Sequence, residues 1–184
     1  LDCRKVAARH PGVKVLNCSI AMPYPGVRTY YGRTFETAFI CGAVAGALSH
    51  GEDVGYIANA PLLGVPAEIN AFALGAQLTS PETRVRLDWS GVHADAFERL
   101  ASEGLEVISN ADFPTPSQAQ NLEGLYRVCG AERVLLALPT WSWGTFYTKL
   151  VKSILHGSWG ALEAHGDGAR ARGSCRDDDA LDDA

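Results

Sequence analysis

The stretch "DVGYIANAPLLGVPAEINAFALGAQLTSPETRVRLDW", residues 53–89, decides the fold class. It opens with an apolar segment typical of a buried strand. It continues through Pro66, placed near a first helical turn, into a helix of about four turns. It closes with "RVRLDW", a second strand. A strand, a helix and a strand joined by short connections predict a parallel pair with a crossover helix.

The same alternation extends in both directions from this unit. Strands are predicted at 13–17, 105–111, 125–128 and 133–139, and helices at 4–10, 34–51, 94–104, 115–124 and 145–157. The segment 20–33 contains two prolines and is expected to be a loop. This order predicts an α/β domain of doubly wound type, with a mostly parallel sheet covered by helices on both faces.

Composition excludes several classes of protein. The chain has 184 residues, of which 47% are hydrophobic and 20% charged, as in ordinary globular proteins. Without a basic face, nucleic-acid binding is not expected. Residues 161–184 lack apolar periodicity and are expected to form a disordered acidic tail.

Cysteine and histidine spacing indicates neither a metal site nor a disulfide framework. The five cysteines are scattered, and Cys41 reads as a small buried hydrophobe. No apolar run reaches the roughly 18 residues of a membrane span. No signal peptide or lipid-anchor cysteine opens the chain, so the sequence is expected to begin within a domain.

Ligands of open α/β sheets bind beyond the carboxyl ends of the strands, which selects three polar residues. His93 follows one predicted strand, and it reads either as a ligand contact or as part of a surface loop. Asn110 lies at the end of the next predicted strand, and Asp112 comes directly after it. Asn110 offers a donor and an acceptor to a ligand, whereas Asp112 either accepts hydrogen bonds from it or caps a short helix.

Two tryptophans follow the last predicted strand, in "LPTWSWG". Trp141 and Trp143 point to one side if the chain is extended there and diverge if Thr140 caps a helix. One ring is expected to pack in the core. At least one is expected to offer a flat surface to a ligand, since stacking of a base on an aromatic ring contributes roughly 1–3 kcal/mol.

Signatures of enzymes are absent from the sequence. There is no phosphate-binding glycine loop, no dinucleotide fingerprint and no nucleophile elbow, so no cofactor is expected. A doubly wound enzyme using Asp112 or His93 for acid–base chemistry stays open as an alternative.

Three segments together resemble the basic membrane protein family, which comprises solute-binding lipoproteins of bacterial ABC importers and includes purine nucleoside receptors. They are "YYGRTFETAFICGAVAGAL", "VGYIANAPLLGVPAEINAFALGAQLTSPETRVRLDW" and "WSWGTFYTKLVKSILHGSW". The resemblance runs from about Val6 to Trp159.

The resemblance implies a type I periplasmic-binding fold, truncated here, and no catalysis. Its two lobes would comprise about 1–35 with 136–160, and about 36–135, as an incomplete solute-binding domain over 1–160. It also implies a small purine-like ligand between the lobes and an ABC permease as partner. The location would be that of a periplasmic or extracellular, membrane-anchored lipoprotein. A cytoplasmic ligand-sensing module of the same fold is the alternative.

Departures from the family pattern favour a nucleobase over a nucleoside. The place of a stacking aromatic in the family falls on His93, and the place of a lysine falls on Trp141. The connection "CGAERV" is too short for the aspartate loop that contacts ribose in nucleoside-binding members. Since the first strands of the family's sheet have no counterpart here, self-association through an exposed sheet edge is also expected.

Overall fold

The computed structural model describes residues 2–18, 26–62, 64–111, 123–158, 170–171 and 173–176. The chain divides into two compact units. The smaller comprises Leu1–Arg33 with Trp141–Arg172, and the larger comprises Thr34–Thr140 with Gly173–Ala184. The chain therefore passes between the units three times. The expected lobes have similar bounds, and their closure on a ligand stays a prediction.

The larger unit contains a six-stranded sheet in the order β4-β3-β5-β6-β7-β9. Its strands are β3 (Val54–Ala58), β4 (Val85–Trp89), β5 (Val107–Asn110), β6 (Gly124–Cys129), β7 (Glu132–Trp141) and β9 (Gly173–Arg176). Strand β3 pairs in parallel with β4 and β5, as the sequence predicts. Strand β5 pairs antiparallel with β6, and β6 pairs antiparallel with β7 through a tight hairpin at Gly130.

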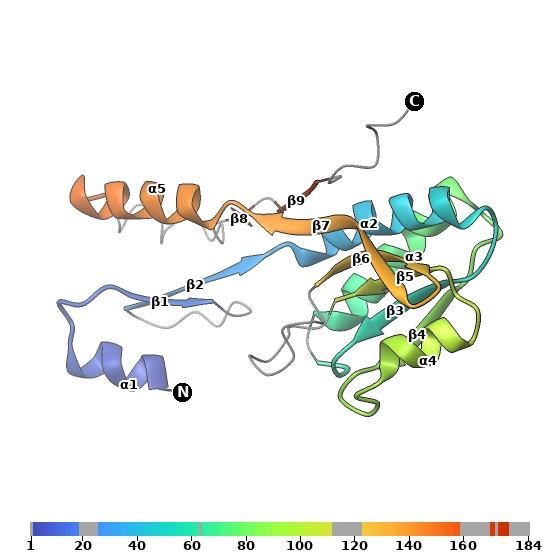
Figure 1. The fold of residues 1–184 in the computed structure, drawn as a ribbon. Coiled ribbons are helices and arrows are strands. Elements are labelled where there is room, and N and C mark those ends of the chain that lie inside the picture. The colour runs from blue at the N-terminus through green and yellow to red at the C-terminus, as the bar shows by residue number, and fades with distance from the viewer. Residues whose placement is uncertain are drawn as a thin grey trace. The chain divides into compact units, whose positions relative to one another are not determined.

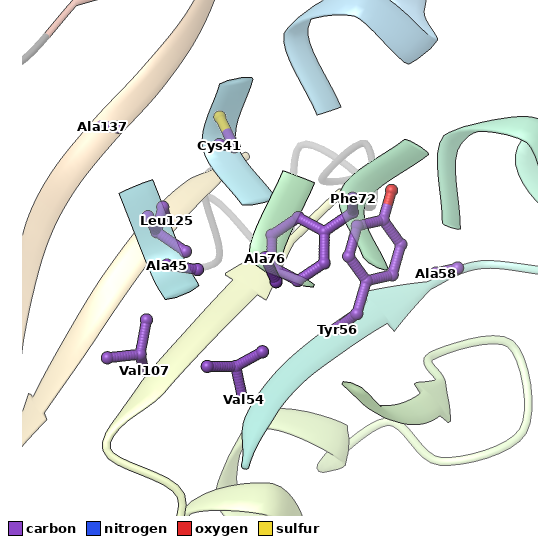
Figure 2. Packing of buried hydrophobic residues seen from close by; sticks show 10 residues of the cluster. All are labelled: Cys41, Ala45, Val54, Tyr56, Ala58, Phe72, Ala76, Val107, Leu125 and Ala137. Carbon is purple, nitrogen blue, oxygen red and sulfur yellow. The ribbon is translucent and has the colours of Figure 1, made fainter. Parts of the chain in front are cut away.

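Helices cover both faces of this sheet (Figure 1). Helices α2 (Thr34–Ser49) and α3 (Val65–Thr79) lie on one face, and α4 (Ala96–Ser102) lies on the other. The alternation of side chains along β3 divides the core accordingly. Val54, Tyr56 and Ala58 pack with α2 and α3, as Figure 2 shows. Ile57 packs with α4 in a second cluster that includes Phe97 and Ile108.

Glycines allow α2 and α3 to approach closely. A Cβ atom on Gly42 would lie 2.0 Å from the carbonyl oxygen of Phe72, and one on Gly75 would lie 2.0 Å from that of Phe39. A Cβ atom on Gly46 would lie 2.2 Å from the carbonyl oxygen of Ala76. The two helix backbones are therefore in direct contact.

The smaller unit combines a short sheet with two helices. Its elements are α1 (Asp2–Arg9), β1 (Val15–Cys18), β2 (Val27–Gly32), α5 (Trp143–Leu155) and β8 (Arg170–Ala171). Strand β2 pairs in parallel with both β1 and β8. No helix among the described residues is both long enough and apolar enough to cross a membrane.

The expectation of a loop throughout 20–33 is wrong for its second half. Residues 27–32 form β2, with Val27 and Tyr30 buried. The two prolines of the segment, Pro23 and Pro25, precede this strand, and the sequence "VRTYY" that follows them is rich in β-branched and aromatic residues. These residues favour an extended conformation, and the prolines that precede them in sequence do not prevent the strand.

Two other expectations fall partly outside the described residues. The segment 161–184, expected to be a disordered tail, contributes the short strands β8 and β9, and most of its other residues are not described. The helix expected at 115–124 lies almost entirely within residues 112–122, which are not described.

Candidate functional site

In the larger unit, three parallel strands end at one edge of the sheet. The ends of β4 and β5 flank the end of β3, and backbone hydrogen bonds hold the following loop residues against it. The Ser90 amide donates to the Ala58 carbonyl at 2.9 Å, and the Gly91 amide donates to the Asn59 carbonyl at 3.1 Å. This is the edge at which open α/β sheets bind ligands.

His93 lies at this edge in contact with a buried carboxylate. Its Nδ1 is 2.7 Å from Oδ1 of Asp88, which is 8% exposed. The backbone amide of Trp89 donates to the same oxygen at 2.8 Å, and Arg99 donates from Nε to Oδ2 at 3.1 Å. Burial acts to raise the pKa of Asp88, but these hydrogen bonds together hold it below its usual range. Asp88 therefore orients the imidazole, and a ligand contact by Nε2 stays a prediction.

Asn110 ends β5 and is 6% exposed. It lies opposite Gly124 in the antiparallel pairing of β5 with β6 and next to Ile57 in the parallel pairing with β3. The predicted position at the strand end is confirmed. Asp112, predicted as its neighbour in the site, lies outside the described residues.

Sequence analysis missed two glutamates near this edge. Glu68, in the first turn of α3, accepts a hydrogen bond from the Thr34 hydroxyl at the start of α2. Glu123 immediately precedes β6 and so lies beside the end of β5. In sequence, Glu68 reads as an ordinary first-turn acid and Glu123 as a loop residue. Only the antiparallel pairing of β6 brings Glu123 to the carboxyl ends of the parallel strands.

Both carboxyl groups are partly removed from water. Burial raises the pKa of Glu68, while the hydrogen bond from Thr34 opposes the shift. Burial, with the charge of Glu68, raises the pKa of Glu123 to about 7. Both shifts favour the neutral carboxyl, as expected for acids that are withdrawn from water and lie near a like charge.

In the smaller unit, the predicted tryptophans belong to a cluster of aromatic rings. The Trp141 and Trp143 ring centres are 5.8 Å apart and stacked at 26°, and Trp143 also stacks on Tyr147 at 6.1 Å and 25°. Tyr30 and Phe146 complete the cluster. Because β7 ends at Trp141 and α5 begins at Trp143, the change from strand to helix brings the two indoles together.

Contacts within the protein already use part of this aromatic surface. Trp141 lies against Gly32, where an added Cβ atom would be 3.1 Å from the indole. The Tyr30 and Tyr147 hydroxyls are 2.6 Å apart. Both tryptophans are partly exposed, so neither of the two is a fully buried core residue. Their service as a ligand platform stays a prediction.

The predicted site residues divide between the two units. His93 and Asn110 belong to the larger unit, and Trp141 and Trp143 belong to the smaller. Within the described ranges, no group of three or more His, Cys, Asp or Glu side chains could hold a metal ion.

Comparison with known proteins identifies relatives of this chain. Residues 4–113 match the model of the Bmp family, described as ABC transporter substrate-binding protein PnrA-like. A putative ABC transporter glucose-binding protein, TsgA13 of Haloferax volcanii, is 31% identical over 72% of this chain and 37% of its own length. A purine-binding protein of Brucella abortus, BAB2_0673, is 28% identical over 84% of this chain and 48% of its own length. This chain thus spans less than half the length of either relative.

A solved structure has the same fold. The solute-binding protein of an ABC transporter system from Conexibacter woesei superposes with a TM-score of 0.63 and 18% sequence identity. The superposition covers 85% of this chain and 58% of that protein. The chain therefore has the α/β fold of a periplasmic binding protein, as its sequence predicts.

Proposed function

This chain belongs to the Bmp family of PnrA-like ABC transporter substrate-binding proteins, and from that premise we propose that it binds a purine base for an ABC importer. The observation that carries the proposal is the family match over residues 4–113, which includes β3, β4 and β5 and the edge where they end. The two relatives described above are named as a glucose-binding and a purine-binding protein, and neither is named as an enzyme.

The polar groups at this edge suit a purine. His93, Asn110 and the two glutamates offer hydrogen-bond donors and acceptors, which fix the orientation of a flat heterocycle. Trp141 and Trp143 are proposed to stack on it, and Asp112 is proposed to accept hydrogen bonds from it. The hairpin that joins β6 to β7 supports a base over a nucleoside, because it leaves no room for a ribose-contacting loop between Cys129 and Glu132.

Isothermal titration calorimetry tests the ligand class directly. The protein is titrated with adenine, guanine, hypoxanthine, their nucleosides and glucose. The proposal expects the bases to bind and the corresponding nucleosides to bind more weakly. Stronger binding of nucleosides would contradict the preference for a base, and binding of glucose alone would replace purine as the ligand.

The importer role implies further partners. An ABC permease is the proposed partner in the membrane, with the protein on the periplasmic or extracellular side as an anchored lipoprotein. Self-association is proposed through β4, which is an edge strand of the six-stranded sheet and exposes Leu87. Sedimentation velocity over a range of concentrations tests the last point, and a monomer at every concentration would contradict it.

A further inference from the structure

The carboxylate of Asp88 has three polar neighbours, and one of them is His93. Its Oδ1 accepts from the backbone amide of Trp89 at 2.8 Å and lies 2.7 Å from Nδ1 of His93. Its Oδ2 accepts from Nε of Arg99 at 3.1 Å. Only 11% of the Asp88 side chain is exposed, so water has little access to these contacts. A carboxylate that pairs with a guanidinium is ionised near neutral pH.

The ionised carboxylate determines which nitrogen of His93 carries hydrogen. A carboxylate only accepts hydrogen bonds, and a neutral imidazole carries its single hydrogen on one nitrogen or the other. Because Nδ1 faces Oδ1 of Asp88, that hydrogen lies on Nδ1. The neutral ring is left with a bare Nε2, which can only accept. Trp89 and Arg99 hold both oxygens of Asp88, so the carboxylate cannot turn away from the ring.

The bare nitrogen belongs to a ring at the ligand edge of the sheet. Within the described part of the chain, the hydrogen bond of the imidazole is the one at Nδ1, and 38% of the side chain is exposed. The backbone also holds the residue, because the His93 amide donates to the Trp89 carbonyl at 2.8 Å. Trp89 ends β4 beside Ala58, the last residue of β3. His93 thus offers an oriented acceptor where the parallel strands end.

We propose that Asp88 is a positioning residue that fixes the tautomer of His93, and that Nε2 of His93 accepts a hydrogen bond from an N–H group of a purine base. The imidazole recognises the ligand with its edge and does not stack its face on it. Asp88 acts on specificity through His93 and touches no ligand. The inference rests on the proposed function and deepens it, because it names the group that selects a donor on the base.

Nuclear magnetic resonance of the ligand-free protein tests the positioning role. Long-range proton–nitrogen spectra distinguish a ring nitrogen that carries hydrogen from one that does not, and they are recorded at pH 8, where free imidazole is neutral. The signals of His93 are identified by their loss in His93→Phe. The wild type should show hydrogen on Nδ1 and none on Nε2. Hydrogen on Nε2 instead would overturn the inference.

Two substitutions of Asp88 test whether its acceptor fixes the tautomer. In Asp88→Asn, the Trp89 amide keeps the side-chain oxygen in the place of Oδ1, because two N–H groups repel each other there. This variant should therefore keep hydrogen on Nδ1 of His93. In Asp88→Ala no acceptor remains, so hydrogen should appear on both nitrogens and the affinity for adenine should fall. Hydrogen that stays on Nδ1 in Asp88→Ala would show that Asp88 does not fix the tautomer.

Calorimetry with adenine at pH 8 tests the recognition of the base. His93→Phe keeps a flat ring and removes the acceptor, so adenine should bind about tenfold more weakly. A phenyl ring that binds adenine as well as the wild type does would favour stacking and overturn the acceptor role. The control is His50→Asn, which should match the wild type. His50 is exposed and precedes β3, so it lies at the opposite edge of the sheet, and asparagine tolerates its positive φ.

Methylated bases identify the donor that His93 selects. Adenine dimethylated on its amino group and adenine methylated on its five-membered ring each lack one kind of N–H. The loss of affinity in His93→Phe should disappear with one of the two. A loss that is equal for adenine and for both methylated forms would overturn the hydrogen bond to Nε2.

The outcomes separate this inference from the proposed function. If purines bind and His93→Phe matches the wild type, the protein is a purine receptor but the acceptor role is overturned. If no purine binds, the proposed ligand and the recognition of its N–H are both overturned, while the spectra still decide the role of Asp88. Circular dichroism of each variant establishes that it is folded before its spectra or affinity are compared.

Discussion

Replacement of Gly75 by alanine tests whether the fold depends on the backbone contact between α2 and α3. Helix propensity alone favours this change by about 1 kcal/mol, because Gly75 lies inside α3. The contact opposes it. The new Cβ atom would lie 2.0 Å from the Phe39 carbonyl oxygen and 2.8 Å from the Ala43 amide nitrogen. Neither atom can turn away as a side chain would.

The magnitude follows from how far the helices must separate. A Cβ atom needs a distance above 3.0 Å from its neighbours, so α2 and α3 must move apart by about 1 Å. Such a movement loosens Ala45, Phe72 and Ala76, which are all 0% exposed. Overpacking of this kind costs about 3 kcal/mol where backbone must shift, which leaves a net loss near 2 kcal/mol after the propensity gain.

Urea unfolding followed by circular dichroism measures this loss. Gly144→Ala is the control, since Gly144 is also helical but has no atom within 4 Å of its added Cβ position. It should stabilise the protein by up to about 1 kcal/mol. The double variant Gly42→Ala with Gly75→Ala should lose less than the sum of the two, because one separation relieves both overlaps. A Gly75→Ala protein as stable as the wild type would refute the packing argument.

Three further predictions concern individual side chains. Asp88→Asn should destabilise the protein by about 2 kcal/mol at pH 7. Since the pKa of Asp88 is lowered in the folded state, the difference in stability from the wild type should shrink in acid. Urea titrations measure this difference, and a value that does not change with pH would contradict the prediction. Tyr147→Phe should cost about 1 kcal/mol and lower the pKa of Tyr30 towards its ordinary value, since the hydrogen bond that Tyr30 makes with Tyr147 is the main cause that raises it. Absorbance titration should detect this change, and an unchanged Tyr30 would count against the bond. The pKa of Glu123 is raised in the folded state, so the stability of the wild type should fall as the pH rises from 4.5 to about 7. Glu123→Gln should therefore be more stable than the wild type at pH 8 by up to about 3 kcal/mol. Chemical denaturation measures both proteins across this range, and equal pH profiles would exclude the prediction.

The strand–helix–strand unit at 53–89 was predictable because its signals are local. Strand β3 is a continuous apolar run that is buried on both faces, and Pro66 marks the start of α3. Strand β2 was not predictable in the same way. Two prolines precede it and favour a loop, although its β-branched and aromatic residues favour a strand and pair with β1 and β8.

The candidate site, too, was predictable only in part. His93 and Asn110 could be selected because each follows a recognisable strand. The contact between His93 and Asp88 could not be predicted, because the sequence does not show which face of the strand Asp88 occupies until the register is known. Glu68 and Glu123 are 55 residues apart in sequence, and they interact only because β6 runs antiparallel to β5. Long-range pairing of this kind leaves no pattern in a single sequence.

The close packing of α2 on α3 also determines the surroundings of Glu68. Thr34 begins α2 and Glu68 lies in the first turn of α3, so their hydrogen bond joins the same two helices that the glycines hold in contact. Bulk at Gly42 or Gly75 would separate the helices and lengthen this bond. Glu68 would then lose the interaction that opposes the rise in its pKa, so that pKa should rise further. The glycines therefore influence the protonation of Glu68 as well as the stability of the fold.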